Sequence, residues 1–139
     1  MNLNKTVPSH INDFIKVQSK CGLKLKTTYF PAVDKPQSTL FFIHSYGSYL
    51  TKYAPVMQFY QSAGYEVIGF DMRGFGESEG PRALITNPQD MLDDSVRFID
   101  AAKKWQLQER GHNLPWVAMG YSLGGCYLLG AYQELHKHP

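Results

Sequence analysis

The sequence predicts an α/β fold in which a mostly parallel sheet is flanked by helices. Continuous apolar runs, typical of strands covered on both faces, alternate along the chain with segments of helical periodicity. Strands that alternate with helices favour parallel pairing. Near its end the chain also carries a strand, a sharp glycine-flanked turn and a helix in direct succession, in the stretch VAMGYSLGGCYLLG from Val117 to Gly130.

Length and composition fit one ordinary domain. The chain has 139 residues, of which 43% are hydrophobic, so it can bury a sizeable core. A formal net charge of +2 gives no general bias toward nucleic acid or other acidic partners. Cys21 and Cys126 show neither a disulfide framework nor metal-ligand spacing, and no metal or cofactor site is predicted. The N-terminus lacks an apolar signal region and the chain lacks a long apolar run, so we expect a soluble, cytoplasmic protein.

The first half of the chain predicts a hairpin, a buried strand and a helix. Two segments of alternating apolar and polar residues, 13–19 and 22–30, are expected to be the arms of a half-exposed antiparallel hairpin. The apolar run from Thr39 to His44 is expected to be a strand covered on both faces. A helix is expected from Lys52 to Ala63, because Gly64 supplies a stop signal.

The second half repeats the alternation of strand and helix. A strand is expected at residues 65–71, and a glycine-rich turn follows it. A long helix then opens at Asn87-Pro88, where asparagine is a good N-cap and proline suits the first turn. The last strand is expected at 115–121 and the last helix from Leu123 onward. The apolar stripe of the long helix indicates core packing and consists of Met91, Leu92, Ser95, Phe98, Ile99, Ala102 and Trp105.

The sequence Gly120-x-Ser122-x-Gly124 is the first motif with chemical content. Between an apolar strand and a helix, it predicts a nucleophile elbow in which the serine has a strained backbone conformation. Side chains at the two glycine positions would collide with neighbouring backbone. The serine then lies at a helix N-terminus, where amide groups and the helix dipole favour a developing negative charge. An ordinary glycine-rich turn between strand and helix is the alternative interpretation.

Two more motifs precede the elbow, FFIHSYGS at residues 41–48 and DMRGFGES at residues 71–78. Together the three motifs resemble the first half of an α/β-hydrolase of the monoacylglycerol lipase type, among the serine aminopeptidase-like hydrolases. The resemblance runs from about Asp13 to the end of the chain. It implies that Ser122 is a catalytic nucleophile.

The motif at residues 41–48 corresponds to the family's His-Gly-x-Gly sequence, whose third residue supplies an oxyanion-hole amide. The resemblance therefore implies an oxyanion hole built from the backbone amides of Tyr46 and Leu123. Ser45 stands where the family usually has glycine, and serine tolerates fewer backbone conformations than glycine. His44 is expected to support this loop and not to act as the catalytic base.

The motif at residues 71–78 resembles the family's Asp-x-Arg-Gly-x-Gly-x-Ser turn. This resemblance implies a scaffold role for Asp71 and Arg73, not a catalytic one. A dinucleotide-binding function is disfavoured, because the spacing is not G-x-G-x-x-G and the glutamates of the turn would repel phosphates.

No residue of the chain fits the catalytic acid or base. In α/β-hydrolases these residues follow the serine in the order Asp or Glu, then His. After Ser122 the sequence offers only Glu134, His136 and His138, on or just beyond the helix that begins at the elbow. The helical rise places them about 18–24 Å from the serine. His10 and His112 lie in segments without a supporting motif. Cys126 is expected to be a small buried packing residue.

We therefore expect residues 1–12 to be a lead and residues 13–139 to be the N-terminal half of a hydrolase domain, ending after the elbow helix without the cap and later strands. The resemblance implies carboxylic esters as substrates, in particular lipid monoesters such as monoacylglycerols. The alternative is a truncated, inactive hydrolase-like module. Residues 116–121 are expected to form an edge strand that invites self-association or a partner subunit. The sequence leaves membrane association open.

Overall fold

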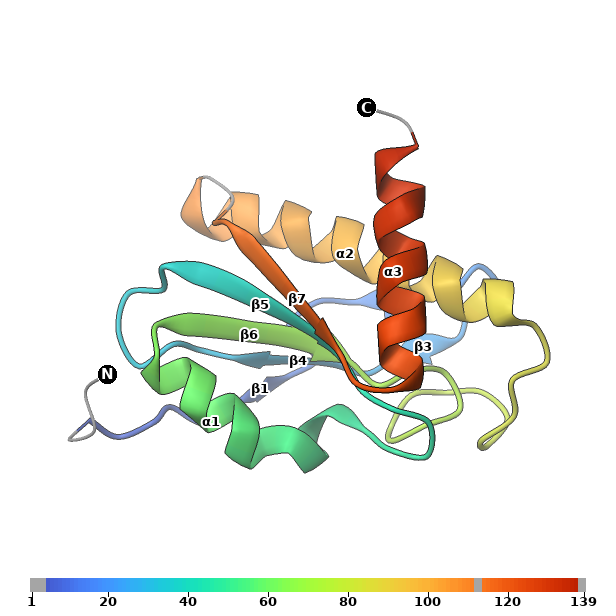
Figure 1. Ribbon diagram of the computed structural model, residues 1–139, viewed down its shortest axis with the longest axis horizontal. Coiled ribbons are helices and arrows are strands. Elements are labelled where there is room, and N and C mark those ends of the chain that lie inside the picture. The colour runs from blue at the N-terminus through green and yellow to red at the C-terminus, as the bar shows by residue number, and fades with distance from the viewer. Residues whose placement is uncertain (1–4, 112–113, 138–139) are drawn as a thin grey trace.

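The computed structural model describes residues 5–111 and 114–137. In this part of the chain a five-stranded sheet lies between α1 on one face and α2 and α3 on the other (Figure 1). The elements in chain order are β1 (Ile11–Asn12), β2 (Val17–Gln18), β3 (Lys24–Leu25), β4 (Thr27–Phe30), β5 (Ser38–Ile43), the 3-10 helix η1 (Leu50–Tyr53), α1 (Ala54–Ser62), β6 (Tyr65–Phe70), α2 (Pro88–Arg110), β7 (Trp116–Gly120) and α3 (Leu123–His136).

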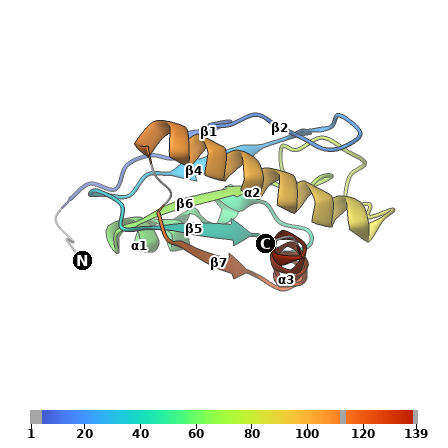
Figure 2. The same cartoon turned by 90° about the horizontal axis from the view of Figure 1, so that it is seen from above.

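The five strands of the main sheet have the order β1-β4-β6-β5-β7 (Figure 2). The three longest strands are parallel, with Phe41 of β5 opposite both Ile68 of β6 and Ala118 of β7. β4 is antiparallel to β6, and β1 is antiparallel to β4. The predicted α/β fold with a mostly parallel sheet is therefore confirmed.

The predicted hairpin forms only in its central part. β2 and β3 make a separate two-stranded antiparallel sheet in which Val17 lies opposite Leu25. The rest of the second arm leaves the hairpin, because β4 pairs with β6 in the main sheet. β1 begins at Ile11, inside the segment expected to be a lead, and pairs with β4.

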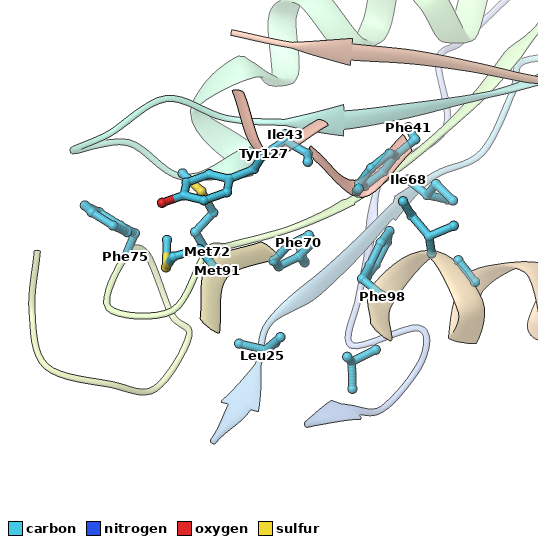
Figure 3. Packing of buried hydrophobic residues seen from close by; sticks show 14 residues of the cluster. Leu25, Phe41, Ile43, Ile68, Phe70, Met72, Phe75, Met91, Phe98 and Tyr127 are labelled. Atoms are coloured by element: carbon cyan, nitrogen blue, oxygen red, sulfur yellow. The ribbon is translucent and has the colours of Figure 1, made fainter. Parts of the chain in front are cut away.

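Both faces of the central strands are buried in hydrophobic cores. Phe41 of β5 belongs to the cluster that α2 and α3 cover, whereas Leu40 and Phe42 belong to the cluster beneath α1. Figure 3 shows the first cluster, in which the ring of Phe98 stacks on Phe41 at 5.3 Å and on Phe70 at 4.9 Å between centroids. Burial on both faces is what a continuous apolar strand sequence predicts.

The start of α2 follows the predicted capping pattern. The side chain of Asn87 accepts a hydrogen bond from the amide of Gln89 at 3.1 Å, and Pro88 is the first helical residue. The predicted apolar stripe faces the core, although Leu92 and Trp105 are only half-buried. Two polar residues that the sequence did not single out, Asp94 and Gln106, are buried on the same face.

The helix that follows β5 begins slightly later than predicted. The chain first makes the 3-10 turn η1, and α1 then runs from Ala54 to Ser62. Gly64 follows α1 with a φ of 90°, a conformation that suits the predicted stop. Within the described residues, every helix is too short or too polar to cross a membrane.

Candidate active site

Ser122 lies in the turn that joins β7 to α3, and its side chain is exposed. Its φ of 52° and ψ of −118° place a non-glycine residue in a strained backbone region. The turn is closed by two backbone hydrogen bonds, from Gly124 to the carbonyl of Tyr121 at 3.0 Å and from Gly125 to the carbonyl of Ser122 at 2.8 Å. The sequence thus folds here into a tight strand-turn-helix corner with the serine at its tip.

The two glycines that flank Ser122 have no room for a side chain. A Cβ atom on Gly120 would lie 2.5 Å from the Cα of Gly125. On Gly124 it would lie 2.3 Å from the carbonyl oxygen of Ile43. Both contacts are with backbone, which cannot move aside cheaply, so the crowding expected of an elbow is present at both positions.

The elbow lies beside the loop that follows β5. The amide of Tyr121 donates to the carbonyl of Ile43 at 3.1 Å, which fixes the elbow against the end of the neighbouring strand. Within residues 5–111 and 114–137, the amides of Tyr46 and Leu123 donate no hydrogen bond. Both amides are therefore without a hydrogen-bond acceptor among the described residues.

His44 directly follows β5 and is completely buried. Its Nε2 accepts a hydrogen bond from the amide of Met72 at 2.9 Å, so Nδ1 carries the proton and donates to the carbonyl of Ser45 at 2.7 Å. Burial lowers the pKa of His44 and keeps the ring neutral. With both nitrogens occupied, His44 supports the loop, as expected, and has no nitrogen left to activate Ser122.

The loop after His44 accommodates serine where the resemblance has glycine. Ser45 does not adopt a positive φ, so it carries no strain from its side chain. Its hydroxyl lies 3.1 Å from the hydroxyl of Tyr53 on η1. The next residue, Tyr46, has a 55% exposed side chain whose hydroxyl donates to the carbonyl of Ala83 at 2.8 Å. Sequence analysis missed Tyr53 and Ala83, since neither lies in a recognisable motif.

Asp71 has the scaffold role that its motif implies. Its two carboxylate oxygens accept hydrogen bonds from the amides of Leu50 at 2.7 Å and Glu77 at 3.0 Å. Arg73 makes a two-point bond to Asp94 on α2, at 2.6 and 2.7 Å. The turn is therefore tied to η1 and α2. In the sequence, the signal for the bond between Arg73 and α2 was Asp94, an acidic residue within the apolar face of that helix.

The candidates that follow the elbow lie at the opposite end of α3. The Nδ1 atom of His136 bonds the carbonyl of Tyr132 at 2.8 Å, and Glu134 pairs with Lys137. His112 and His138 lie outside the described residues. In the part of the chain that the structure describes, nothing hydrogen-bonds the hydroxyl of Ser122.

The expectation that Cys126 is buried is wrong. The residue is exposed, because α3 buries only the face that carries Gly124, Tyr127 and Ala131. A position four residues after the serine therefore lies on the exposed side of the helix.

Residues 34–139 match the family model described as serine aminopeptidase, S33. Among curated proteins, phospholipase YtpA of Bacillus subtilis is 28% identical over 92 residues, which cover 66% of this chain and 33% of YtpA. Monoglyceride lipase of Homo sapiens is 24% identical over 117 residues, which cover 84% of this chain and 37% of the lipase. The chain thus spans about a third of the length of these relatives.

Solved structures share the fold. A soluble variant of monoglyceride lipase from Saccharomyces cerevisiae matches with a TM-score of 0.67 at 22% identity, over 90% of this chain and 38% of that one. A thermostable carboxyl esterase from Bacillus coagulans matches with a TM-score of 0.68 at 18% identity, over 89% of this chain and 40% of that one. At these identities the likeness establishes the fold.

Proposed function

The chain belongs to the serine aminopeptidase S33 family and carries part of the α/β-hydrolase fold, and on this basis we propose that it is the nucleophile-bearing part of a carboxylic-ester hydrolase. Lipid monoesters, such as monoacylglycerols, are the proposed substrate class, because a phospholipase and a monoglyceride lipase are among its relatives. The strongest support is the elbow itself, where Ser122 is exposed at a positive φ between two glycines that admit no side chain.

The proposed reaction is acyl transfer through a covalent intermediate. The Oγ of Ser122 attacks the ester carbonyl carbon and gives up its proton to a general base, and the alcohol leaves with a proton as the ester C–O bond breaks. Water then cleaves the acyl-serine and releases the acid. The amides of Leu123 and Tyr46, which donate to no described residue, would hold the oxyanion in both steps.

We assign the general base and its orienting acid to a region beyond the described residues. His44 is unsuitable because both of its nitrogens are hydrogen-bonded inside the protein. In α/β-hydrolases the acid and the histidine follow the nucleophile in the chain. The curated relatives, of which this chain spans about a third, have the length to supply both.

A second candidate function is that of an inactive module which pairs with another protein chain. One observation favours it. β7 pairs only with β5 in the described sheet, and its residues Val117 and Ala118 are exposed. An unpaired strand edge of this kind can add a strand from a partner.

The test is covalent labelling of the natural, full-length protein with a fluorophosphonate probe, followed by intact-mass and peptide mass spectrometry. We expect one adduct, on Ser122, and none in Ser122→Ala. Ser62→Ala, which removes a serine on α1, should label like the wild type. A wild-type protein that stays unlabelled, or that labels on another residue, would refute the hydrolase proposal and favour the module.

A further inference from the structure

The loop that carries the Tyr46 amide has little backbone support of its own. Among the described residues, the amides from Tyr46 to Tyr49 donate no hydrogen bond. Gly47 adds a φ of 70° within the same loop. A backbone segment without internal hydrogen bonds keeps a fixed position only when side chains anchor it.

Three side chains provide such anchors, one to η1 and two to the connection between β6 and α2. His44 accepts from the amide of Met72, and the hydroxyl of Ser45 bonds that of Tyr53. Tyr46 is anchored most directly, because the same residue carries the candidate oxyanion amide and the anchoring phenol. The hydroxyl of Tyr46 donates to the carbonyl of Ala83 at 2.8 Å, although more than half of the side chain is exposed.

The ring of Tyr46 also has a fixed neighbour. It lies edge-on to the ring of Phe75, with centroids 5.1 Å apart and an interplanar angle of 71°. Phe75 is buried and belongs to the core cluster of Figure 3. Ring contact and hydrogen bond together hold one orientation of an exposed tyrosine, whose two side-chain torsions would otherwise be free.

The far end of this anchor is itself rigid. The amide of Ala83 donates to the carbonyl of Gly74 at 3.0 Å, and the amide of Gly74 donates to the carbonyl of Glu79 at 3.0 Å. Arg82 adds a bond to the carbonyl of Gly76 at 2.8 Å. Ala83 has a φ of 54°, which a non-glycine residue keeps only where its surroundings enforce it. The carbonyl that receives the Tyr46 hydroxyl is therefore held in place.

We propose that Tyr46 is a positioning residue for its own amide. By bonding the Ala83 carbonyl, its phenol fixes the loop so that the Tyr46 N–H points at the oxyanion. This inference rests on the proposed esterase function and adds to it a role for the Tyr46 side chain and for its partner Ala83, which lies outside the motif. An oxyanion-hole donor is effective only within hydrogen-bond distance of the developing charge, so small displacements of the loop cost rate rather than substrate binding.

The test compares Tyr46→Phe with Tyr49→Phe in the natural, full-length protein. Tyr46→Phe keeps the ring beside Phe75 and removes only the hydroxyl. Tyr49 is a partly exposed tyrosine of the same loop region whose hydroxyl bonds no described residue. Hydrolysis of p-nitrophenyl butyrate gives kcat and KM, and a trifluoromethyl ketone, which forms a tetrahedral oxyanion on the serine, reports on the oxyanion hole separately.

We expect Tyr46→Phe to lower kcat by about tenfold and to weaken binding of the trifluoromethyl ketone by about the same factor. KM should stay within about twofold of the wild type. Tyr49→Phe should leave all three values within about twofold. A thermal unfolding midpoint close to the wild type in both variants separates positioning from general destabilisation. If the wild type shows Ser122-dependent activity and Tyr46→Phe retains both kcat and ketone affinity, this inference alone is overturned. A wild-type protein without such activity would overturn the proposed function as well.

Discussion

His44 is a buried titratable residue whose hydrogen bonds require one protonation state. Its Nε2 must be unprotonated to accept from the amide of Met72, while Nδ1 donates to the carbonyl of Ser45. Burial pushes the pKa of His44 below its ordinary value. Protonation would thus break the bond that joins the end of β5 to the turn after β6.

This arrangement makes stability depend on pH. The pKa in the folded state lies below the unfolded value of about 6.5, so the unfolded state binds the proton first as pH falls. We expect the free energy of unfolding to be highest above about pH 7 and to fall below about pH 6.5, by at most about 1.4 kcal/mol per pH unit. Urea unfolding at several pH values between about 7 and 5.5 measures the slope of the free energy of unfolding against pH. This range lies above the pH at which carboxylates ordinarily titrate.

The matched variants are His44→Gln and His10→Gln. The first should flatten the slope, whatever it does to absolute stability, because the titrating group is gone. The second removes an exposed histidine and should leave the slope as in the wild type. An unchanged slope in His44→Gln would mean that another group causes the pH dependence.

The residues that could be predicted at the candidate site are those with local constraints. Gly120 and Gly124 follow from the turn itself, since any elbow of this shape crowds the positions two residues from the serine. The partners of Ser45 and Tyr46 could not be predicted. Ala83 lies 37 residues from Tyr46, and the bond between them depends on how two loops meet in space.

A buried hydrogen-bond network joins β4, β5 and β6 to α2, at the end of the sheet opposite the elbow. Glu66 of β6 is completely buried, and one of its oxygens accepts from Thr39 at 2.8 Å and from Gln106 of α2 at 2.7 Å. The other oxygen accepts from Tyr29 at 3.0 Å and bonds Arg110. Burial raises the pKa of Tyr29 to about 12, so its phenol remains a donor at neutral pH.

Removing the shared acceptor should therefore loosen α2 from the sheet. In Glu66→Ala the donors of Thr39 and Gln106 lose their common partner inside the protein. We expect the free energy of unfolding to fall by about 3 kcal/mol, measured by chemical denaturation. Glu134→Ala removes a partly exposed carboxylate that pairs with Lys137 on α3, and should cost less than about 0.5 kcal/mol. Equal losses in the two variants would contradict a structural role for the Glu66 network.

Elements were predictable where periodicity and capping act over a few residues. The apolar runs of β5, β6 and β7 and the Asn87-Pro88 start of α2 are such cases. The short strands β1 to β3 and the Glu66 network were not predictable in detail. A strand of two residues has no periodicity to recognise, and Glu66 and Gln106 are 40 residues apart. Their pairing follows only from the packing of α2 on the sheet.

The two edges of the described sheet are formed by β1 and β7. β1 and the small β2–β3 sheet lie toward one side, whereas β7 forms the other edge with α3 beside it (Figure 2). Val117 on β7 is 47% exposed, and Leu129 and Tyr132 on α3 are 69% and 61% exposed. Apolar side chains next to unpaired strand backbone are a combination that folded proteins usually cover.

The 139-residue chain by itself should therefore self-associate through β7. We expect its weight-average mass in sedimentation equilibrium to rise above 15.8 kDa with increasing protein concentration. Val117→Lys places a charge on the open edge and should shift the mass back toward the monomer. Val56→Lys is the matched control, since Val56 on α1 is also 47% exposed but lies away from this edge. If both lysine variants associate like the unsubstituted chain, β7 is not the contact, and the candidate function as a pairing module loses the observation that favours it.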